Sequence, residues 1–420
     1  MELNPPRGTA DLLPPGADAM LDLYEEAHRL ARLFGYRYVD TPAFEHTELF
    51  SRAAGETSDV VTKEMYTFED KGGRSLTLRP EGTAPVVRAY LDRAHDLPSP
   101  FKGYYLFTMW RHGRPQAGRM REFRQFGVEA IGEPGPGPDA EVIVVADRFL
   151  RERGLARVRL LVNSIGDEVC RPAYRAELLA YLEASRERIS DEHRDRFREN
   201  PLRVLDCKDE ACVAVAAGAP IITDRLCAEC ADHFSSVRAA LDEEGVAYEV
   251  EPRLVRGLDY YTRTAFEFAS GVLSRGQATL CGGGRYDGLA EVLGGSPTPG
   301  VGFGLGLERV LLAMEKEGLA MPAGRGPACY LVTLGEEAAK LGRELVRELR
   351  AAGVPAAAGF EERPLGAQMR AADRAGAAYA VIVGEREVAD GTATLRRLSD
   401  GEQETIAAAG LVQKLKGLVP

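Results

Sequence analysis

Arg256-Gly-Leu-Asp-Tyr-Tyr261-Thr-Arg-Thr-Ala-Phe-Glu267 sets two arginines, two tyrosines and two carboxylates in a stretch that otherwise has the pattern of a buried β-strand. An arginine side chain always carries its charge, and its planar set of donors suits a phosphate group. Tyr260 and Tyr261 add flat aromatic surfaces, each with a hydroxyl at its tip. The segment predicts a strand beside a site for a phosphate and a small polar ring. A half-exposed strand with a solvated arginine is the alternative.

Further strands are predicted on both sides of this segment. Residues 104–110 and 122–129 run apolar or alternate apolar with polar side chains, which predicts a β-hairpin. Its connection, residues 112–120, lies within a cluster of arginines at positions 111, 114, 119, 121 and 124. Other strands are expected at 75–79, at 158–162 and between 252 and 304, with helices at 18–34, 139–153 and 305–317.

Two changes of pattern divide the chain. From about residue 165 to 249, charged helical runs, followed by four cysteines between residues 207 and 230, replace the strands, which indicates an insertion. A linker rich in proline and glycine then precedes strands that alternate with helices, the pattern of a mostly parallel sheet covered by helices. We expect a strand-rich domain of residues 1–165 and 250–320, a helical insertion of residues 166–249, and a small α/β domain of residues 327–420.

The composition disfavours several classes of protein. The 420 residues carry a formal net charge of −11, which disfavours non-specific binding to nucleic acid but allows a specific partner at the clustered arginines. Seven cysteines, an odd number spread over a long chain, argue against a secreted disulfide framework. The polar, proline-broken start and the absence of a long apolar run predict a cytoplasmic protein without a membrane span.

Three glycine-containing motifs are candidate ligand sites. Gly300-Val-Gly-Phe-Gly-Leu-Gly306 does not have the spacing of a dinucleotide fingerprint, and the chain has no Gly-Lys dipeptide to form a P-loop. Alternate glycines clear one face of a strand for a planar ligand, and Arg309 follows where it could meet phosphates; tight strand–helix packing is the alternative. Gly283-Gly-Arg-Tyr-Asp287 is a ligand loop or a plain turn, and Arg79-Pro-Glu-Gly-Thr83 is an ammonium clamp or a helix N-cap.

In their order along the chain, these motifs resemble the signatures of histidyl-tRNA synthetase. The resemblance extends from Arg7-Gly-Thr to the C-terminal domain, and its most specific parts surround Arg256 and Arg285. The residues that carry it are Arg79-Pro-Glu-Gly-Thr83, Arg111 with Arg114-Pro-Gln116, Gln125-Phe-Gly-Val-Glu129, Arg256-Gly-Leu-Asp-Tyr-Tyr261, Gly283-Gly-Arg-Tyr-Asp287 and Gly302-Phe-Gly-Leu-Gly-Leu-Glu-Arg309.

The resemblance implies a fold and a reaction. The fold is an α+β catalytic domain with a class II antiparallel sheet flanked by helices, a helical insertion that approaches the tRNA acceptor arm, and a C-terminal α/β anticodon-binding domain. A homodimer is implied as well, with Pro42 at the place of the family's interface proline. The reaction joins L-histidine to tRNA(His) at the expense of ATP, with Mg²⁺ accompanying ATP and no prosthetic group.

The resemblance also implies roles for individual residues. Arg111 and Arg309 bind the ATP phosphates, and Arg256 holds the α-phosphate during attack, so that Arg256 and Arg111 are the catalytic pair. Histidine is bound by Glu81, Thr83, Gln125, Glu129, Tyr260 and Tyr261. The tRNA acceptor end is expected to contact Arg114, Gln116 and Arg119.

Position 113 departs from the family pattern. The family usually has an acidic residue two positions after the arginine that corresponds to Arg111, where it contacts the adenine amino group. Here that position is Gly113. We therefore expect weaker ATP binding than in relatives, and a Gly113→Glu variant with an unchanged Michaelis constant for ATP would count against this explanation.

The insertion contains Cys207, Cys212, Cys227 and Cys230, with His233 just beyond, at nearly the spacing of a structural zinc site. The resemblance requires no metal there, and free cysteines often pack as small core residues. We expect no bound metal, and a zinc ion at these four cysteines is the alternative.

One competing function shares the fold. A non-catalytic paralogue, the regulatory subunit of ATP phosphoribosyltransferase, binds histidine without charging tRNA. Such a paralogue generally lacks the anticodon domain and has eroded catalytic motifs, whereas this chain has the C-terminal α/β pattern together with Arg111, Arg256 and Arg309. The sequence therefore favours the ligase.

Overall fold

A computed structural model describes residues 3–55, 60–207, 209–255, 260–274, 276–321, 326–359 and 363–418. The chain forms two compact units, residues 1–322 and 323–420, and each is described by itself. Among the described residues, no helix is both long and apolar enough to cross a bilayer.

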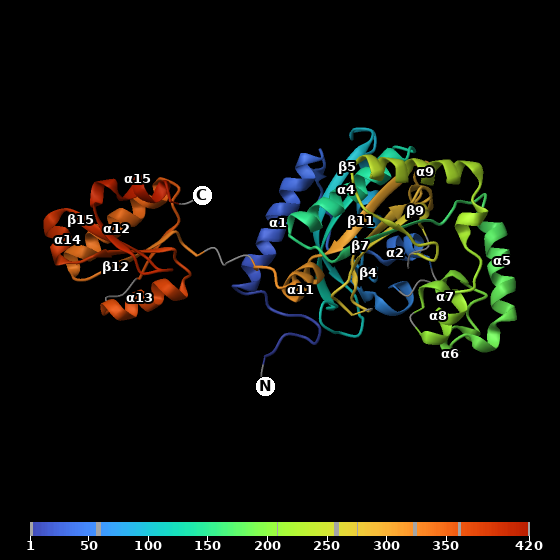
Figure 1. Ribbon diagram of the computed structural model, residues 1–420, viewed down its shortest axis with the longest axis horizontal. Helices are drawn as coiled ribbons and strands as arrows, with labels where there is room; N and C mark the ends of the chain where they lie inside the picture. Colours follow the sequence, from blue (N-terminus) through green and yellow to red (C-terminus); the bar gives the residue numbers. More distant parts are fainter. Residues whose placement is uncertain are drawn as a thin grey trace. The chain divides into compact units, whose positions relative to one another are not determined.

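The first unit is built on an eight-stranded sheet in the order β1-β5-β6-β11-β10-β9-β7-β8 (Figure 1). Neighbours are antiparallel from β5 to β7, while the short edge strands β1 and β8 pair in parallel. This confirms the expected antiparallel sheet. The strands are β1 (Arg37–Tyr38), β5 (Phe101–Trp110), β6 (Glu122–Ile131), β7 (Val158–Ser164), β8 (Glu249–Val250), β9 (Thr262–Ser270), β10 (Thr279–Arg285) and β11 (Gly300–Gly306).

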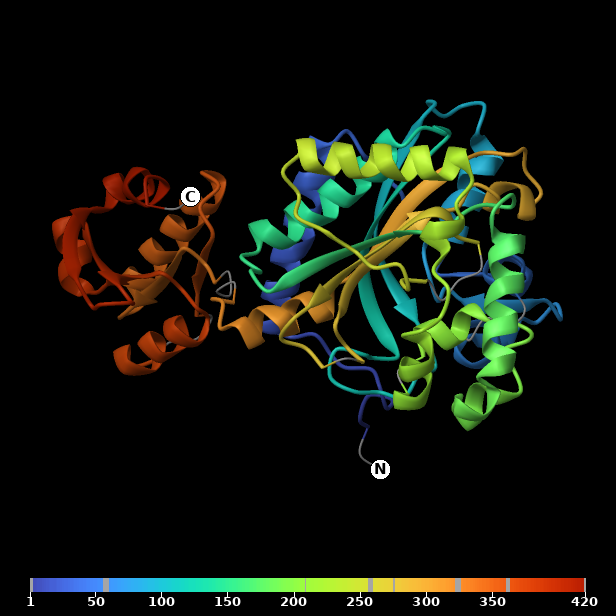
Figure 2. The ribbon, with the colours of Figure 1, turned by 45° about the vertical axis from the view of Figure 1, so that its right-hand side comes forward.

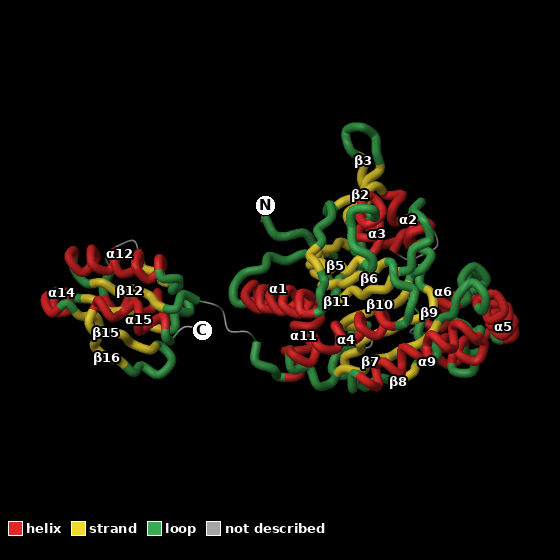
Figure 3. The backbone as a smooth tube through the Cα atoms, turned by 90° about the horizontal axis from the view of Figure 1, so that it is seen from above, coloured by secondary structure: helices red, strands yellow, loops and turns green. Residues whose placement is uncertain are grey.

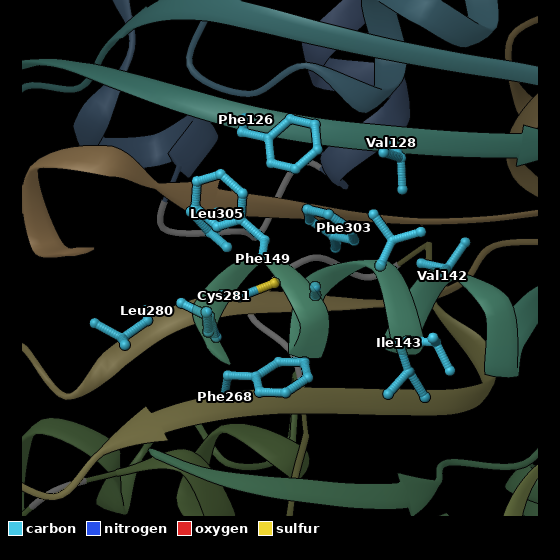
Figure 4. Packing of buried hydrophobic residues seen from close by; sticks show 14 of the residues in the cluster. Phe126, Val128, Val142, Ile143, Phe149, Phe268, Leu280, Cys281, Phe303 and Leu305 are labelled. Atoms are coloured by element: carbon cyan, nitrogen blue, oxygen red, sulfur yellow. The ribbon is translucent and has the colours of Figure 1, made fainter. Parts of the chain in front are cut away.

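Side-chain alternation gives this sheet two different faces. Phe126 and Val128 of β6 and Phe303 of β11 point to one face, where they pack against the helices that cover it (Figure 4). Phe126 meets Phe303 edge to face, with ring centroids 5.4 Å apart. The helices of this core are α1 (Gly16–Leu33), α4 (Gly137–Glu152), α9 (Ala228–Glu243) and α11 (Leu307–Glu317).

The opposite face carries a second core and a small three-stranded sheet. The small sheet has the order β2 (Phe44–His46), β4 (Ser75–Leu78), β3 (Tyr66–Glu69), and its β3–β4 hairpin stands out from the unit in Figure 3. Helices on this side are α2 (Thr47–Ala54), the π-helix η1 (Val60–Glu64), α3 (Thr83–Arg93) and α10 (Leu289–Val292). Tyr105 of β5 and Tyr286 belong to this second core, beside α3.

The insertion is helical and has a core of its own. Tyr174, Leu178, Phe197 and Val215 are among its buried residues. In Figure 2 its helices, in green, gather at one end of the first unit, and α9, in yellow-green, runs back along the large sheet. Its other elements are α5 (Arg171–Ala184), η2 (Arg186–Arg188), α6 (Asp191–Arg194), α7 (Leu202–Asp206), α8 (Glu210–Ala216) and η3 (Ile222–Arg225).

The second unit is an α/β domain with the sheet order β13-β12-β14-β15-β16. The first three strands are parallel, as predicted, and β15 and β16 extend the sheet as antiparallel strands. Its elements are β12 (Cys329–Thr333), α12 (Glu336–Ala351), β13 (Ala356–Ala358), α13 (Leu365–Arg374), β14 (Tyr379–Val383), α14 (Glu385–Asp390), β15 (Thr392–Arg397), β16 (Gln403–Ala407), η4 (Ala408–Gly410) and α15 (Leu411–Lys416).

Candidate active site

A pocket of about 300 Å³ lies over the face of β6, β10 and β11 that the apolar side chains leave free. Eight of the residues expected to bind substrates line it: Glu81, Thr83, Arg111, Arg119, Gln125, Tyr260, Tyr261 and Arg309. Arg114 and Gln116 are exposed on the loop between β5 and β6 and do not line it. Arg256 lies outside the described residues.

The glycines of β11 make room for this pocket. Val301, Phe303 and Leu305 point into the helical core, so Gly304 and Gly306, which alternate with them, lie on the pocket side. Gly304 pairs with Gly282 of β10, which also lines the pocket, so peptide groups form this part of its floor. The prediction that alternate glycines clear one strand face is confirmed.

Glu81 lines the pocket and bonds the first turn of a helix. Its carboxylate accepts hydrogen bonds from the backbone N–H groups of Thr83, at 2.7 Å, and Ala84, at 3.0 Å, in the first turn of α3. Burial raises the pKa of Glu81, and these two bonds and the charge of Arg111 partly oppose that effect. The motif at residues 79–83 therefore fixes a helix start and also presents a carboxylate to the pocket.

Glu129 is completely buried beside the pocket. Its carboxylate accepts hydrogen bonds from the hydroxyls of Thr83, at 2.8 Å, and Tyr286, at 2.6 Å, with the Tyr105 hydroxyl at 3.4 Å. The pKa of Glu129 is raised to about 8. Burial is the main cause, the hydrogen bonds from Tyr286 and Thr83 oppose it, and the charge of Glu81 adds to it. Near neutral pH this carboxyl therefore carries a proton in the free protein.

Tyrosine side chains enclose the same end of the pocket. The rings of Tyr260 and Tyr261 lie 4.6 Å apart, and Tyr286 meets Tyr260 at 5.9 Å. Tyr286 was within reach of the sequence argument, because it belongs to the motif at 283–287. Tyr105 gave no such signal, since it lies in an apolar strand. Together they form an aromatic, hydrogen-bonding pocket of the kind that fits a small polar ring.

The other end of the pocket is positively charged. The Nε atom of Arg111 donates to the Pro80 carbonyl at 2.7 Å. Arg309 donates to the carbonyls of Gly118, at 3.0 Å, and Thr279, at 2.7 Å, so it ties the arginine-rich loop to the sheet. Burial lowers the pKa of Arg309, and the neighbouring charges of Arg111 and Arg119 lower it further. This repulsion among cations favours a polyanionic ligand such as a triphosphate.

A carboxylate not anticipated from the sequence lies next to Gly113. A Cβ atom built on Gly113 would stand 3.5 Å from Oε1 of Glu64, which pairs with Arg119 at 2.7 Å. Glu64 lines the pocket and arrives from η1, about fifty residues earlier in the chain. A Cβ atom on Gly113 would lie nearer still to the Arg119 guanidinium, at 3.3 and 3.4 Å, so both a cation and a carboxylate border this position. Weaker ATP binding stays a prediction.

Parts of the two most specific motifs lie away from the pocket or differ from the expected structure. The strand expected across residues 256–267 begins only at Thr262 within the described residues. Arg285, in the second specific motif, is fully buried and bonds Asp139 of α4 through Nε, at 3.1 and 3.2 Å, and through Nη2. It also donates to the carbonyl of Gly135 at 2.6 Å. Arg285 therefore locks β10 to α4 and does not line the pocket.

Cys207, Cys212, Cys227 and Cys230 do not form one group, so the alternative of a zinc ion bound by these four cysteines is wrong. Cys227 and Cys230 lie at the start of α9, which meets the turn after β7. Cys207 and Cys212 flank the start of α8 and lie near His193. Sequence spacing suggested a single tetrad, but the two helix starts are in different places.

Replacing Gly302 with alanine is expected to lower histidine affinity by at least tenfold. A Cβ atom there would overlap Oε2 of Glu129 and lie 2.5 Å from the Val128 carbonyl, so the strand pair has to shift. Gly137→Ala, at the start of α4, is the control, because a Cβ atom there meets no other atom within 4 Å and Gly137 does not line the pocket. Calorimetric titration with histidine measures both, and equal affinities would contradict the prediction.

Comparison with known proteins agrees with this geometry. A family model of histidyl-tRNA synthetase matches residues 8–310, and a model of an anticodon binding domain matches residues 328–418. Histidine-tRNA ligases of Moorella thermoacetica and Acetivibrio thermocellus are 49% identical over 411 residues and 44% identical over 412 residues. These alignments cover 97% and 98% of this chain, and 96% and 99% of the relatives.

A solved structure is similar as well. The crystal structure of apo S. aureus histidyl-tRNA synthetase has a TM-score of 0.81 and 37% sequence identity, and it covers 99% of this chain and 100% of its own. A family model that spans most of the chain, and relatives matched over nearly their whole length, lead to one conclusion: this chain belongs to the histidyl-tRNA synthetase family.

Proposed function

We propose that the protein is a histidine-tRNA ligase, which activates L-histidine with ATP and transfers it to the 3′ end of tRNA(His). One observation carries this proposal. One pocket has the buried Glu81 with Tyr260 and Tyr261 at one end, where the buried Glu129 lies beside it, and Arg111, Arg119 and Arg309 at the other. The first end suits an amino acid with a polar ring, and the second suits the phosphates of ATP.

The first step forms histidyl-adenylate. A carboxylate oxygen of histidine attacks the α-phosphorus of ATP, the bond to the β-phosphate oxygen breaks, and pyrophosphate leaves with its electron pair. Arg256 is proposed to hold the α-phosphate and Arg111 and Arg309 the remaining phosphate oxygens. Such a reaction depends on alignment and on charge stabilisation in the transition state.

The second step forms the aminoacyl ester. A hydroxyl of the terminal tRNA ribose attacks the activated carbonyl carbon, and AMP leaves. Arg114 and Gln116 are exposed on the β5–β6 loop, whose Arg119 borders the pocket, and this supports the proposal that these three residues contact the acceptor end. The second unit is proposed to bind the anticodon, in keeping with the family model that it matches.

Magnesium is proposed to arrive bound to the phosphates of ATP. Glu308 lines the pocket, but both of its oxygens accept the backbone N–H of Arg124, at 3.0 and 2.9 Å, and one also accepts from the Arg124 guanidinium. Glu64 pairs with Arg119. Mg²⁺ would neutralise phosphate charge, and the arginines would align the reacting groups.

Recognition of the imidazole is proposed to rest on Glu81, Gln125, Glu129, Tyr260 and Tyr261, with Thr83 holding Glu129 in place. A buried site built around hydrogen bonds rejects an isostere without them by about ten-thousandfold or more, because its own polar groups would go unpaired. The same logic makes a separate editing activity unnecessary.

Histidine affinity is expected to be highest between about pH 6.5 and pH 8. We place one proton between Glu129 and the bound imidazole. Free Glu129 has a pKa of about 8, so above that pH the complex has to take up a proton, and the affinity falls by up to about tenfold per pH unit. Below about pH 6.5 free histidine is protonated as well, so binding has to release a proton.

Calorimetry in buffers of different ionisation enthalpy measures both the affinity and the proton count. Glu129→Gln is the control, because an amide does not titrate and the fall between pH 8 and pH 9 should be reduced. An affinity that rises through pH 8 would mean that the complex contains the ionised carboxylate and neutral imidazole, which contradicts the shared proton.

The proposed activity is tested by histidine-dependent exchange of labelled pyrophosphate into ATP without tRNA. We expect exchange with histidine alone among the amino acids, and a loss of about a thousandfold in Arg256→Ala. Histidine binding without exchange would point to the regulatory paralogue of ATP phosphoribosyltransferase. The anticodon-domain match at residues 328–418 favours the ligase.

Assembly and location are proposed on the same basis. Tyr38, Phe44 and Phe68 are 52%, 49% and 44% exposed, near the proposed interface residue Pro42, and this supports a homodimer that covers them. A cytoplasmic location follows from the proposed reaction, which needs tRNA.

The catalytic domain is proposed to comprise residues 1–165 and 250–320, the insertion residues 166–249, and the anticodon-binding domain residues 327–420.

A further inference from the structure

Three cysteines and an aspartate converge at the base of the insertion. Asp167 and Cys170 belong to the turn between β7 and α5, and Cys227 and Cys230 to the start of α9. One ligand atom from each lies within 4.8 Å of all the others. They belong neither to the pocket nor to the residues given a role in the reaction.

The spacing of these atoms is that of a metal-ligand tetrahedron. The Sγ atoms of Cys170 and Cys230 are 3.8 Å apart, and Oδ1 of Asp167 lies 3.4 Å from Cys170 Sγ and 3.8 Å from Cys227 Sγ. Zinc holds thiolates at about 2.3 Å and carboxylate oxygens at about 2.0 Å, which places sulfurs about 3.8 Å apart and a sulfur and an oxygen about 3.5 Å apart. An ion at the centre would need little movement of the ligands.

Backbone structure supports thiolate ligands at this place. The pairs Asp167 and Cys170, and Cys227 and Cys230, each have the three-residue spacing of a metal-binding turn. Cys170 is the N-cap of α5 and Cys227 is the N-cap of α9, so two helix N-termini meet the cluster. A helix N-terminus favours negative charge beside it, as a ligand set of sulfurs and a carboxylate would supply.

Gly166 makes the turn compact enough to hold the cluster. Its φ of +67° belongs to the left-handed region, and a Cβ atom there would lie 2.5 Å from Cys170 Sγ. The Asp167 carboxylate accepts the N–H groups of Val169, at 3.0 Å, and Cys170, at 3.4 Å, which fixes its orientation. The carboxylate thus caps the turn and also places Oδ1 among the sulfur atoms, where it completes a set of four ligand atoms.

We propose that Asp167, Cys170, Cys227 and Cys230 bind a structural zinc ion. Soft sulfur ligands in tetrahedral arrangement favour zinc over the hard cations magnesium and calcium. Arg263 lies 3.5 Å from both Asp167 and Glu229, where it offsets the negative charge of three thiolates and a carboxylate.

The zinc site would brace the histidine-binding end of the pocket. The backbone of Ile165 and Gly166 exchanges two hydrogen bonds of 2.7 Å with Arg263. Arg171, in the first turn of α5, donates to the carbonyls of Ile165 and Tyr261. The metal would therefore hold the turn against which Tyr261 rests.

Metal analysis of the full-length protein by mass spectrometry tests the proposal independently of catalysis. The Cys227→Ala/Cys230→Ala variant should contain one equivalent of zinc less than the wild type. Cys207→Ala/Cys212→Ala removes the same number of cysteines from the neighbouring group and should keep that equivalent. Equal zinc in wild type and Cys227→Ala/Cys230→Ala, or loss of the equivalent only in the control, would overturn the proposal.

Cobalt substitution decides the matter if the variant does not fold. Wild-type protein loaded with Co²⁺ should show a thiolate-to-cobalt charge-transfer band and the visible bands of tetrahedral cobalt, and the control should keep both. Wild-type protein without a charge-transfer band, with its cysteines freely reactive toward a thiol reagent in the native state, would also overturn the proposal.

Discussion

Arg111→Ala is expected to slow histidine-dependent pyrophosphate exchange by about a thousandfold, because removal of one aimed donor typically costs roughly 3 to 4 kcal/mol of transition-state stabilisation. The Arg111 side chain is held by its Nε bond to Pro80 and by the Phe123 ring, 5.6 Å from the guanidinium carbon. Its terminal nitrogens thus have a fixed direction. A donor that is already aligned loses little freedom when charge develops on the phosphate.

The loss should appear mainly in the rate, and histidine affinity should fall much less, because Arg111 acts on the histidine-binding residues only through its charge near Glu81 and its bond to the Pro80 carbonyl. Arg111→Lys keeps the charge but not the planar fork of donors, and should recover only part of the rate. Arg114→Ala, on the same loop but exposed, is the matched control and should exchange pyrophosphate at the wild-type rate. A loss below tenfold in Arg111→Ala, or a parallel loss of histidine affinity by calorimetry, would contradict the role.

Asp139→Ala is expected to lower the free energy of unfolding of the first unit by about 3 to 5 kcal/mol, the cost of leaving a buried charge without its partner. Asp139 and Arg285 are both fully buried, and His233 of α9 also bonds Asp139, at 3.1 Å. Without the carboxylate, the Arg285 charge stays inside the protein with fewer partners.

The measurement is denaturant unfolding followed by the fluorescence of Trp110, the single tryptophan of the chain, which lies in the first unit. Asp147→Ala is the control on the same helix. Asp147 pairs with Arg151, and their side chains are 15% and 55% exposed. Burial raises the pKa of Asp147 and so opposes its charged form, and solvent screens the pair at Arg151, so its loss should cost about 1 kcal/mol or less. Similar losses in the two variants would show that the buried network does not carry the stability assigned to it.

The pKa of Asp139 also predicts how the stability of the protein changes in acid. Burial raises the pKa of Asp139, but the hydrogen bond with His233 and the charge of Arg285 outweigh it, so the pKa lies below its usual value. A carboxyl with a lowered pKa contributes stability above its unfolded-state pKa, and that stability is lost as the pH falls through the folded value.

The sequence predicted the features that depend on local pattern. The hairpin of β5 and β6 followed from alternating side chains, and its register runs without a break from Phe101 and Ile131 to Trp110 and Glu122. The free face of β11 followed from the spacing of its glycines. The motif at residues 79–83 left an ammonium clamp and a helix N-cap as alternatives, and in the structure Glu81 both bonds the start of α3 and lines the pocket.

Features that depend on contacts between distant segments could not be predicted from the sequence. The raised pKa of Glu129 needs burial among Tyr105, Tyr286 and Thr83, which belong to separate segments of the chain. The grouping of the cysteines was equally hidden. Cys227 and Cys230 are visible as a pair, but their partners lie about sixty residues earlier, after β7. Spacing along a chain shows which residues can share a turn, and only packing shows which turns meet.

The glycine strand β11 limits how this protein can change. The pocket side of β11 consists of peptide groups, so a substitution cannot alter a side chain there without adding atoms. A Cβ atom added at Gly302 would overlap the Glu129 carboxylate. A lineage that came to accept another amino acid would have to do so through the residues around the pocket, while β11 stayed the same. The part of the protein that contributes fewest side chains is therefore the part whose history should be the most conservative.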